Sequence, residues 1–318
     1  GSFNTAIGGG ALENNTASNN TAVGALALDA NTTGDQNTAV GKDALGANTT
    51  GIRNAAVGSK ALDANTTGSY NTALGSNALT SNTTASNNVG LGEWALGSNT
   101  TGTNNTAVGT FALDSSTTGS YNTALGYDSL GVNTTGGYNT ALGHGALDAN
   151  TTASHNTAVG NAALSANTTG TENTAVGRAA LEASTTSNEN TAVGYYALLA
   201  NTTGAYNTAI GADALKGVTT GSYNHGFGRD AGQSITTGSG NVCLGNNSND
   251  AANTNFVVSV GGFSASANTV DGITAVGYYA LRNSSTGTGN HAFGYYALDQ
   301  VTTGSRNTAV GYESGKNN

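Results

Sequence analysis

The sequence predicts an all-β protein, a parallel β-solenoid (β-roll) of about nineteen coils, and three observations lead to this fold class. A unit of 16 or 17 residues repeats along the whole 318-residue chain, apolar residues recur at fixed positions of the unit, and the chain has 48 glycines and no proline. Units this short are too small for pairs of helices, so we expect each one to form a single turn of a solenoid.

The repeat reads N-T-A-V-G-x-x-A-L-D-A-N-T-T-G-x-x, and its positions are numbered 1 to 17 from the asparagine that opens most units. We expect one solenoid array over residues 1–318. Irregular coils are expected at 224–272, where position 9 loses its leucine and two units shorten to 16 residues. This stretch is expected to be a joint or a specialised contact. The units begin at residues 4, 20, 37, 54, 71, 88, 105, 122, 139, 156, 173, 190, 207, 224, 241, 257, 273, 290 and 307.

Positions 1 to 5 are expected to form a strand whose side chains stack on identical neighbours. Asparagine amides at position 1 should hydrogen-bond along the axis, as in cross-β assemblies. Position 5 is glycine in every unit, which indicates a positive φ or a backbone approach too close for a Cβ atom. This structural ladder includes Asn37, Asn54, Asn71, Asn105 and Asn122 at position 1, Val40, Val57 and Leu74 at position 4, and Gly41, Gly58 and Gly75 at position 5.

The second half of the unit is expected to hold another short strand and a turn. Positions 8 and 9 read Ala-Leu in most units, and the Asn-Thr-Thr-Gly of positions 12 to 15 is turn chemistry with a left-handed glycine. The dipeptide Asn-Gly, which favours antiparallel hairpins, never occurs. Without proline every backbone N–H can donate between coils, so parallel stacking is expected.

Each unit has few large apolar side chains with which to order its 17 residues. In a strand, positions 2 and 4 face one side while positions 1, 3 and 5 face the other. We infer that one apolar column lines the interior of the coil and that another contacts sister chains. The sequence leaves open which column does which.

Composition excludes several functions. The net charge is −9, and the nine Lys and Arg residues are scattered, so no nucleic acid partner is expected. No apolar run approaches the length of a bilayer span, so we expect no membrane insertion by this segment. A single cysteine and four dispersed histidines support neither a disulfide, a metal site nor a catalytic triad, and we expect no cofactor and no enzyme activity.

Two histidines replace the threonine of position 2. His225 lies two residues before Phe227, and His291 lies two residues before Phe293. We expect the two side chains of each pair to lie in the core and to compensate for each other's volume.

The tyrosines fall in the variable positions 6, 7 and 17, which should lie at outer corners of the coil. Exposed aromatic rings among Asn, Thr and Ser are suited to stacking on sugars. The alternative is that they pack on neighbours in adjacent coils or chains. The candidate glycan contacts are Tyr70, Tyr121, Tyr138, Tyr195, Tyr196, Tyr206, Tyr223, Tyr278, Tyr279, Tyr295 and Tyr296.

The sequence of positions 1 to 9 resembles repeats of a known protein family. Segments such as NTAVGKDAL (37–45), NTALGSNAL (71–79) and NTAIGADAL (207–215) resemble the head repeats of trimeric autotransporter adhesins of the YadA type, and the arrays are also similar to β-solenoid repeats of phage tail fibres. The similarity covers the whole chain, although these units are longer than those usual in the adhesin family. The resemblance implies a left-handed β-roll, a homotrimer around one axis, and display on a cell surface or virion.

We therefore expect an extracellular structural fibre segment whose variable positions contact a cell-surface glycan or protein receptor. The chain begins at position 15 and ends at position 12 of the repeat, so an alternative is a filament in which one subunit completes the next subunit's coil. A less favoured alternative is an ice-binding solenoid built on the threonine columns.

Overall fold

The computed structural model describes residues 1–251 and 253–317. Ala252, inside the irregular stretch, and Asn318, in the half coil expected at the end, lie outside the described residues. The described residues form 19 short strands and no helix. The chain divides into two compact units, residues 1–156 and 157–318, and each unit is a parallel β-solenoid.

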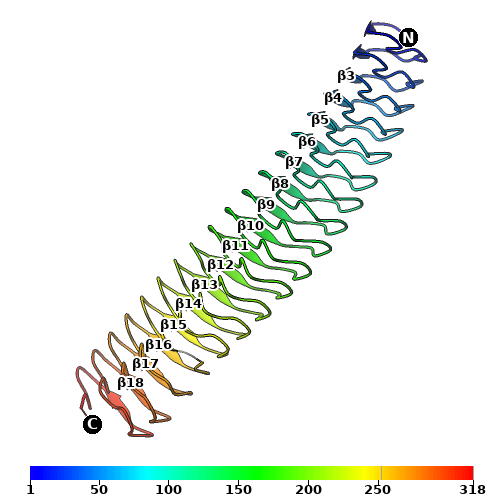
Figure 1. Cartoon of the computed structure of the whole chain (residues 1–318). Coiled ribbons are helices and arrows are strands. Elements are labelled where there is room, and N and C mark those ends of the chain that lie inside the picture. The colour runs from blue at the N-terminus through cyan, green and yellow to red at the C-terminus, as the bar shows by residue number, and fades with distance from the viewer. Residues whose placement is uncertain (252, 318) are drawn as a thin grey trace. The chain divides into compact units, whose positions relative to one another are not determined.

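Every coil carries one strand of three residues at positions 2 to 4 (Figure 1). In the first unit the strands are β1 (Thr5–Ile7), β2 (Thr21–Val23), β3 (Thr38–Val40), β4 (Ala55–Val57), β5 (Thr72–Leu74), β6 (Val89–Leu91), β7 (Thr106–Val108), β8 (Thr123–Leu125) and β9 (Thr140–Leu142). In the second unit they are β10 (Thr157–Val159), β11 (Thr174–Val176), β12 (Thr191–Val193), β13 (Thr208–Ile210), β14 (His225–Phe227), β15 (Val242–Leu244), β16 (Val258–Val260), β17 (Thr274–Val276), β18 (His291–Phe293) and β19 (Thr308–Val310).

Within each unit, neighbouring strands pair in parallel and in the same register. In the pair β4–β5, for example, Ala56 pairs with Ala73 and Val57 pairs with Leu74. The expected parallel stacking is therefore confirmed, and each position of the repeat forms a column of like side chains.

The prediction of a second strand at positions 8 and 9 is wrong. These residues form a turn, and the leucine of position 9 is left-handed, with φ of 51° at Leu45 and 54° at Leu62. Positions 7 and 17 are left-handed as well, for example at Lys60 and Tyr70. The glycine of position 15, such as Gly51, is not left-handed, contrary to expectation. Sharp bends at positions 7, 9 and 17, rather than a second strand, close each coil.

Position 5 requires glycine both for its positive φ and for its close approach to the neighbouring backbone, the two possibilities that the sequence indicated. Gly41 has a φ of 137°, a region that residues with a Cβ atom rarely adopt. A Cβ atom on Gly41 would also lie 2.4 Å from the carbonyl oxygen of Gly58 in the next coil. The conformation and the close contact recur through the column.

The interior of the coil is lined by the alanines of positions 3 and 8 and the leucine of position 9. Ala56, Ala61 and Leu62 are fully buried, as are their counterparts in nearly every coil. Position 4 faces outward instead, with Leu74 49% exposed. The structure thus identifies positions 3, 8 and 9 as the interior columns, a choice that the sequence left open.

Asparagines at position 1 are buried and connect coils through the backbone. The backbone N–H of Asn54 donates to Oδ1 of Asn37 at 2.9 Å, while Nδ2 of Asn54 donates to the carbonyl oxygen of Gly68 at 2.9 Å. Each side chain therefore accepts from one coil and donates to the turn of its own coil. These hydrogen bonds are needed because a buried amide without a hydrogen-bond partner reduces the free energy of unfolding.

A second asparagine column at position 12 pairs side chain to side chain. Nδ2 of Asn48 donates to Oδ1 of Asn31 at 2.8 Å, and Nδ2 of Asn65 donates to Oδ1 of Asn48 at 2.9 Å. The same Nδ2 of Asn65 donates to the carbonyl oxygen of Gly68 at 3.0 Å, which fixes the turn. The amide ladder expected at position 1 is present in part of the second unit, where Nδ2 of Asn241 donates to Oδ1 of Asn224 at 2.9 Å. The ladder at position 12 was not predicted.

In the irregular stretch, apolar residues take over positions that are leucine or asparagine elsewhere. Gly232 replaces the leucine of position 9, and a Cβ atom there would lie 3.1 Å from both Cδ1 of Ile235 and Sγ of Cys243. Cδ2 of Leu215 would lie still closer, at 2.7 Å, so three side chains fill the space of the missing leucine. Packing changes in one coil are compensated by its immediate neighbours.

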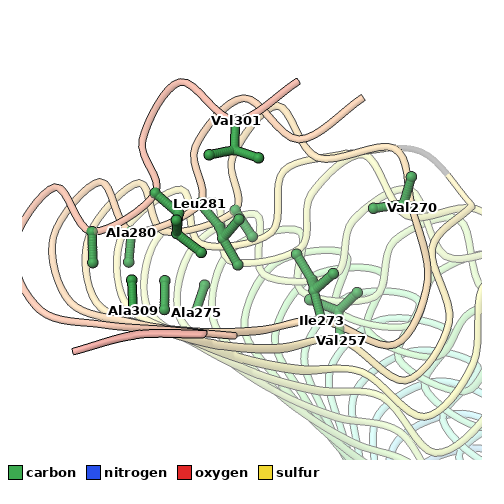
Figure 2. Close-up of a cluster of buried hydrophobic side chains, with 12 residues drawn as sticks. Val257, Val270, Ile273, Ala275, Ala280, Leu281, Val301 and Ala309 are labelled. Atoms are coloured by element: carbon green, nitrogen blue, oxygen red, sulfur yellow. The ribbon is translucent and has the colours of Figure 1, made fainter. Parts of the chain in front are cut away.

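The apolar replacement continues toward the end of the second unit. Val257 and Ile273 occupy position 1 in place of asparagine, and both are buried. Figure 2 shows them beside each other in a cluster that also contains Leu281 and Val301. This part of the core is held by hydrophobic contacts where the rest relies on amide ladders.

Candidate functional site

The outward face of the sheet is the most uniform surface of the molecule. Because side chains alternate along a strand, positions 2 and 4 point away from the alanine of position 3. We call the residues at positions 2 and 4 of all coils the outward stripe. Its exposed large apolar members include Ile7, Val57, Leu74, Leu125, Leu142, Val193, Ile210, Phe227, Phe293 and Val310.

The outward stripe has threonine in most coils at position 2 and an apolar residue in every coil at position 4. No Asp, Glu, Lys or Arg occupies position 2 or 4 in any coil, although the chain has 27 such residues (9 Lys and Arg plus 18 Asp and Glu). In-register pairing aligns threonine with threonine and branched apolar residues with one another, as for Thr174 with Thr191 and Val176 with Val193. Contiguous exposed apolar surfaces of this kind mark interaction sites.

The histidines expected in the core lie on this stripe. His225 is exposed, and its neighbour Phe227 is 39% exposed. His291 and Phe293 occupy the equivalent places in β18, and Phe293 is 40% exposed. The expected exchange of volume in the core is therefore wrong. It assumed that position 4 faces inward, whereas the small residue of position 3 does.

Variable positions lie at the corners on both sides of the stripe. At position 17, the rings of Tyr121 and Tyr138 stack with centroids 4.9 Å apart, and Tyr138 stacks on His155 at 5.0 Å. Tyr206 and Tyr223 form a similar pair at 4.9 Å. The rings lie one above another along the coils, so the faces between them are covered.

Positions 6 and 7 hold a larger aromatic cluster near the end of the second unit. The position-6 rings of Tyr278 and Tyr295 stack at 5.7 Å, and the position-7 rings of Tyr279 and Tyr296 lie 5.1 Å apart. Tyr312 continues the first column at 5.4 Å from Tyr295. Tyr312 was not among the predicted contacts, although its place at position 6 of the repeat was a sufficient signal.

Cations cover several of the remaining ring faces. Nη1 of Arg53 donates to the hydroxyl of Tyr70 at 2.9 Å, and the guanidinium lies 5.4 Å from the ring centroid. Arg178 lies near Tyr195 and Tyr196, 5.7 Å and 5.6 Å from their centroids. These are cation–π contacts between side chains of one chain. They leave the hydroxyls and ring edges as the groups exposed to a ligand.

A cation also covers the aromatic cluster of the last coils. Arg282 lies 4.4 Å from the centroid of Tyr279, and its Nε is 3.0 Å from Oδ1 of the buried Asp299. Lys316 lies 4.5 Å from the centroid of Tyr296. The repeat consensus did not predict these contacts, because position 10 is usually acidic or small.

Hydrogen bonds between neighbouring hydroxyls influence the ionisation of two tyrosines. The hydrogen bond with Tyr196 raises the pKa of Tyr195, and the hydrogen bond with Tyr279 raises the pKa of Tyr278. Both side chains therefore remain neutral phenols at physiological pH, and these corners display hydroxyl groups without negative charge.

Position 16, which the sequence analysis treated as variable, has a structural role. The hydroxyl of Ser69 accepts a hydrogen bond from the backbone N–H of Ile52 at 3.1 Å, and the hydroxyl of Ser86 accepts one from Ser69 at 3.0 Å. The signal in the sequence was the excess of Ser, Thr, Asn and Asp at this position, since all four have an oxygen that can accept.

The described residues provide no enclosed site for chemistry. Residues 1–251 and 253–317 form no pocket and no group of three or more His, Cys, Asp or Glu side chains arranged to hold a metal. None of the segments that the structure describes is a helix long and apolar enough to cross a membrane. Burial raises the pKa of the Cys243 thiol to about 12, so it is not a reactive thiolate.

The geometry therefore presents an uncharged outward stripe with aromatic corners on either side as the candidate functional surface. Comparison with known proteins adds no identification, since no protein-family model and no curated protein matches the chain.

Proposed function

We propose that the protein is a structural, non-catalytic segment of an extracellular fibre, in which several copies associate through the outward stripe. The single observation that carries the proposal is the absence of Asp, Glu, Lys and Arg from positions 2 and 4 of every coil, although the apolar side chains of position 4 are exposed in many of them. Copies of a chain with a net charge of −9 repel one another. On this face two copies can approach without bringing like charges together. The occupant of the face is thus a second copy of the same chain.

Three copies around one axis is the assembly we favour. The resemblance of the repeats to YadA-type heads and phage tail fibres supports a trimer. The columns of like side chains also support it, because a cyclic assembly needs each copy to offer the same face at every level. The corners then remain outside the contact and are free to vary. There, tyrosine hydroxyls and ring edges are the groups available to a glycan or protein receptor.

The first test is the mass of the chain in solution by light scattering. We expect a discrete species near three times the chain mass of 31.1 kDa. Leu74→Lys combined with Leu125→Lys places two charges on the stripe and should release the single chain. Ser76→Lys is the matched control, since Ser76 is exposed in the same coil but off the stripe. A wild-type chain of 31.1 kDa at all concentrations would exclude the proposal.

A second test addresses receptor contact at the corners. Binding of the wild-type chain to a glycan array is compared with that of a variant in which Tyr70, Tyr121 and Tyr223 are serine. If the corners contact glycans, the signal decreases in the variant while the mass in solution is unchanged. Equal binding by both chains would show that these three tyrosines do not contact the glycan.

Ice binding is a second candidate for the same face. The threonines of position 2 and the branched residues of position 4 form an in-register, uncharged array. The heterogeneous positions 6, 7, 16 and 17, which argued against an ice-binding face, lie outside the strands. Thermal hysteresis measured on the chain distinguishes the two functions. Hysteresis from a monomer favours ice, and its absence in a trimer favours the fibre.

A further inference from the structure

Four tyrosines at position 17 are held in stacked pairs one coil apart. Tyr121 and Tyr138 have centroids 4.9 Å apart and rings inclined by only 7°, and Tyr206 and Tyr223 have centroids 4.9 Å apart with rings inclined by 8°. All four are about half exposed, between 42% and 57%. Each pair thus combines close rings with access to reagents in solution.

The last coils extend this arrangement over three levels. Tyr278, Tyr295 and Tyr312 stack in one column at 5.7 Å and 5.4 Å, and Tyr279 lies 5.1 Å from Tyr296 in the adjoining column. These coils belong to the part of the second unit in which buried asparagines are replaced by apolar residues. Phenol pairs are densest in these coils, where Val301 replaces the asparagine of position 12 while Asn290 and Asn307 still pair at position 1.

We propose that the stacked tyrosine pairs are sites of oxidative coupling, at which a peroxide-driven one-electron oxidant of the peroxidase class joins successive coils as dityrosine. Each phenol loses one electron and one proton to give a phenoxyl radical. The two radicals form a carbon–carbon bond between the ring carbons next to the hydroxyls, and the ring hydrogens displaced there restore the two hydroxyl groups. One hydrogen peroxide accepts the two electrons and two protons and becomes two waters.

The fold favours coupling within one chain. The backbone fixes the partner ring one coil away, so its effective concentration far exceeds that of any ring on another molecule. The product closes a loop of one coil and links its two ends covalently, as a disulfide would. In a fibre this would prevent individual coils from unwinding.

The chain contains a matched tyrosine that cannot couple in this way. Tyr127 is 50% exposed, close to the 52% of Tyr121, but its ring neighbours are His144 at 5.4 Å and Phe111 at 6.0 Å. It has the same access to oxidant and similar aromatic contacts, without a second phenol. A comparison of Tyr121 with Tyr127 therefore separates geometry from exposure.

The test treats the whole chain with a peroxidase and limiting hydrogen peroxide, then digests it with a protease that cuts before aspartate. Cleavage at Asp114, Asp128 and Asp148 separates Tyr121, in peptide 114–127, from Tyr138, in peptide 128–147. We expect these peptides to be recovered linked, with the loss of two hydrogen atoms. Tyr121→Phe keeps the stack but should reduce the linked product at least about tenfold, whereas Tyr127→Phe should leave it unchanged.

Chains labelled with light and heavy nitrogen are unfolded, mixed and refolded together before oxidation, so that assemblies contain both isotopes and the linked peptides show where the bond forms. Coupling within a chain gives linked peptides of a single isotope, as we expect. Two results would overturn the inference: linked peptides that mostly mix the isotopes, or a link between these peptides that survives Tyr121→Phe.

Discussion

At the scale of single residues, the position-12 asparagine ladder shows what one interruption leaves behind. Ser116 replaces asparagine there and is fully buried. Its side chain is too short to reach the neighbouring coil, so its own hydroxyl and Oδ1 of Asn99 have no hydrogen-bond partner. Buried polar atoms of this kind reduce stability.

Ser116→Asn is expected to stabilise the protein. The new Nδ2 would donate to Oδ1 of Asn99, and the new Oδ1 would accept from Nδ2 of Asn133, as in the intact part of the ladder. We expect a gain of about 1–2 kcal/mol in the free energy of unfolding, measured by thermal or denaturant unfolding. Ser115→Asn, one residue earlier and outside the ladder, should change nothing. An unchanged or lowered stability of Ser116→Asn would contradict this account.

The acids of position 10 should make stability depend on pH. Burial, followed by the charge of Asp128, raises the pKa of Asp114 above its ordinary 3.8. Burial also raises the pKa of Asp63 and Asp148. A raised pKa in the folded state means that folding favours the protonated form. The contribution of these groups is complete below the unfolded pKa and is lost as pH rises through the folded pKa.

Asp114→Asn should therefore raise the melting temperature at about pH 7, where the wild-type carboxylate is charged. The difference from wild type should shrink as pH falls below 3.8, because both side chains are then neutral. Unfolding curves at several pH values measure both effects. A variant that is less stable than wild type at neutral pH would indicate that the carboxylate makes a favourable contact.

At the scale of the coil, the glycine of position 5 tests the bend that follows the strand. Gly58 has a φ of 137°, and a Cβ atom would lie 2.4 Å from the carbonyl oxygen of Gly75. Gly58→Ala should cost about 3 kcal/mol or more, because strain and a backbone clash add. Gly9→Ala is the control, since a Cβ atom there meets nothing within 4 Å. Similar unfolding midpoints for the two variants would show that the coil can relax.

The sequence predicted the coil well at positions where the residue type is compatible with only one local structure. The glycine of position 5, the parallel stacking and the column of like residues could be predicted because a fixed period places each residue beside its copy. The second strand was missed because Ala-Leu is apolar in strands and turns alike. Nothing in the leucine of position 9 indicates that it adopts a left-handed conformation in the interior.

The candidate site was predicted less completely for a related reason. Alternation showed that positions 2 and 4 share a face, but it did not show whether that face lines the interior, and His225 and His291 were wrongly expected in the core. The leucine of position 9 fills the interior beside the strand, so position 3 holds a small residue there, while Leu74 at position 4 is 49% exposed. Tyrosines could be placed at corners, whereas their stacking partners and covering cations depend on side-chain directions that the pattern does not specify.

At the scale of the whole molecule, stability should vary along each stack, because each coil contacts mainly its neighbours. In the second unit the irregular stretch lacks the leucine of position 9 at Gly232, Asn249 and Ala265. Its interior relies instead on side chains from other positions, such as Ile235, Cys243 and Val257. Local opening is expected where such contacts are fewer.

Hydrogen exchange measured by mass spectrometry checks this expectation. Amides in residues 241–272 should exchange at least about tenfold faster than amides in residues 174–207 of the same unit. Equal protection in both stretches would show that Ile235, Cys243 and Val257 compensate fully for the missing leucines, and that the irregular stretch is not a joint.

The hydrogen bonds between coils have one further consequence, for how the gene can change. Most partners between coils lie 17 residues apart, as Asn37 does from Asn54 and Asn48 from Asn65. If a whole unit of the coding sequence is duplicated or deleted, side chains at the fixed positions of the repeat meet residues of the same type as before. Length can then change by recombination between repeats without repair elsewhere, whereas loss of a few codons inside a unit disrupts the register of the coils around it.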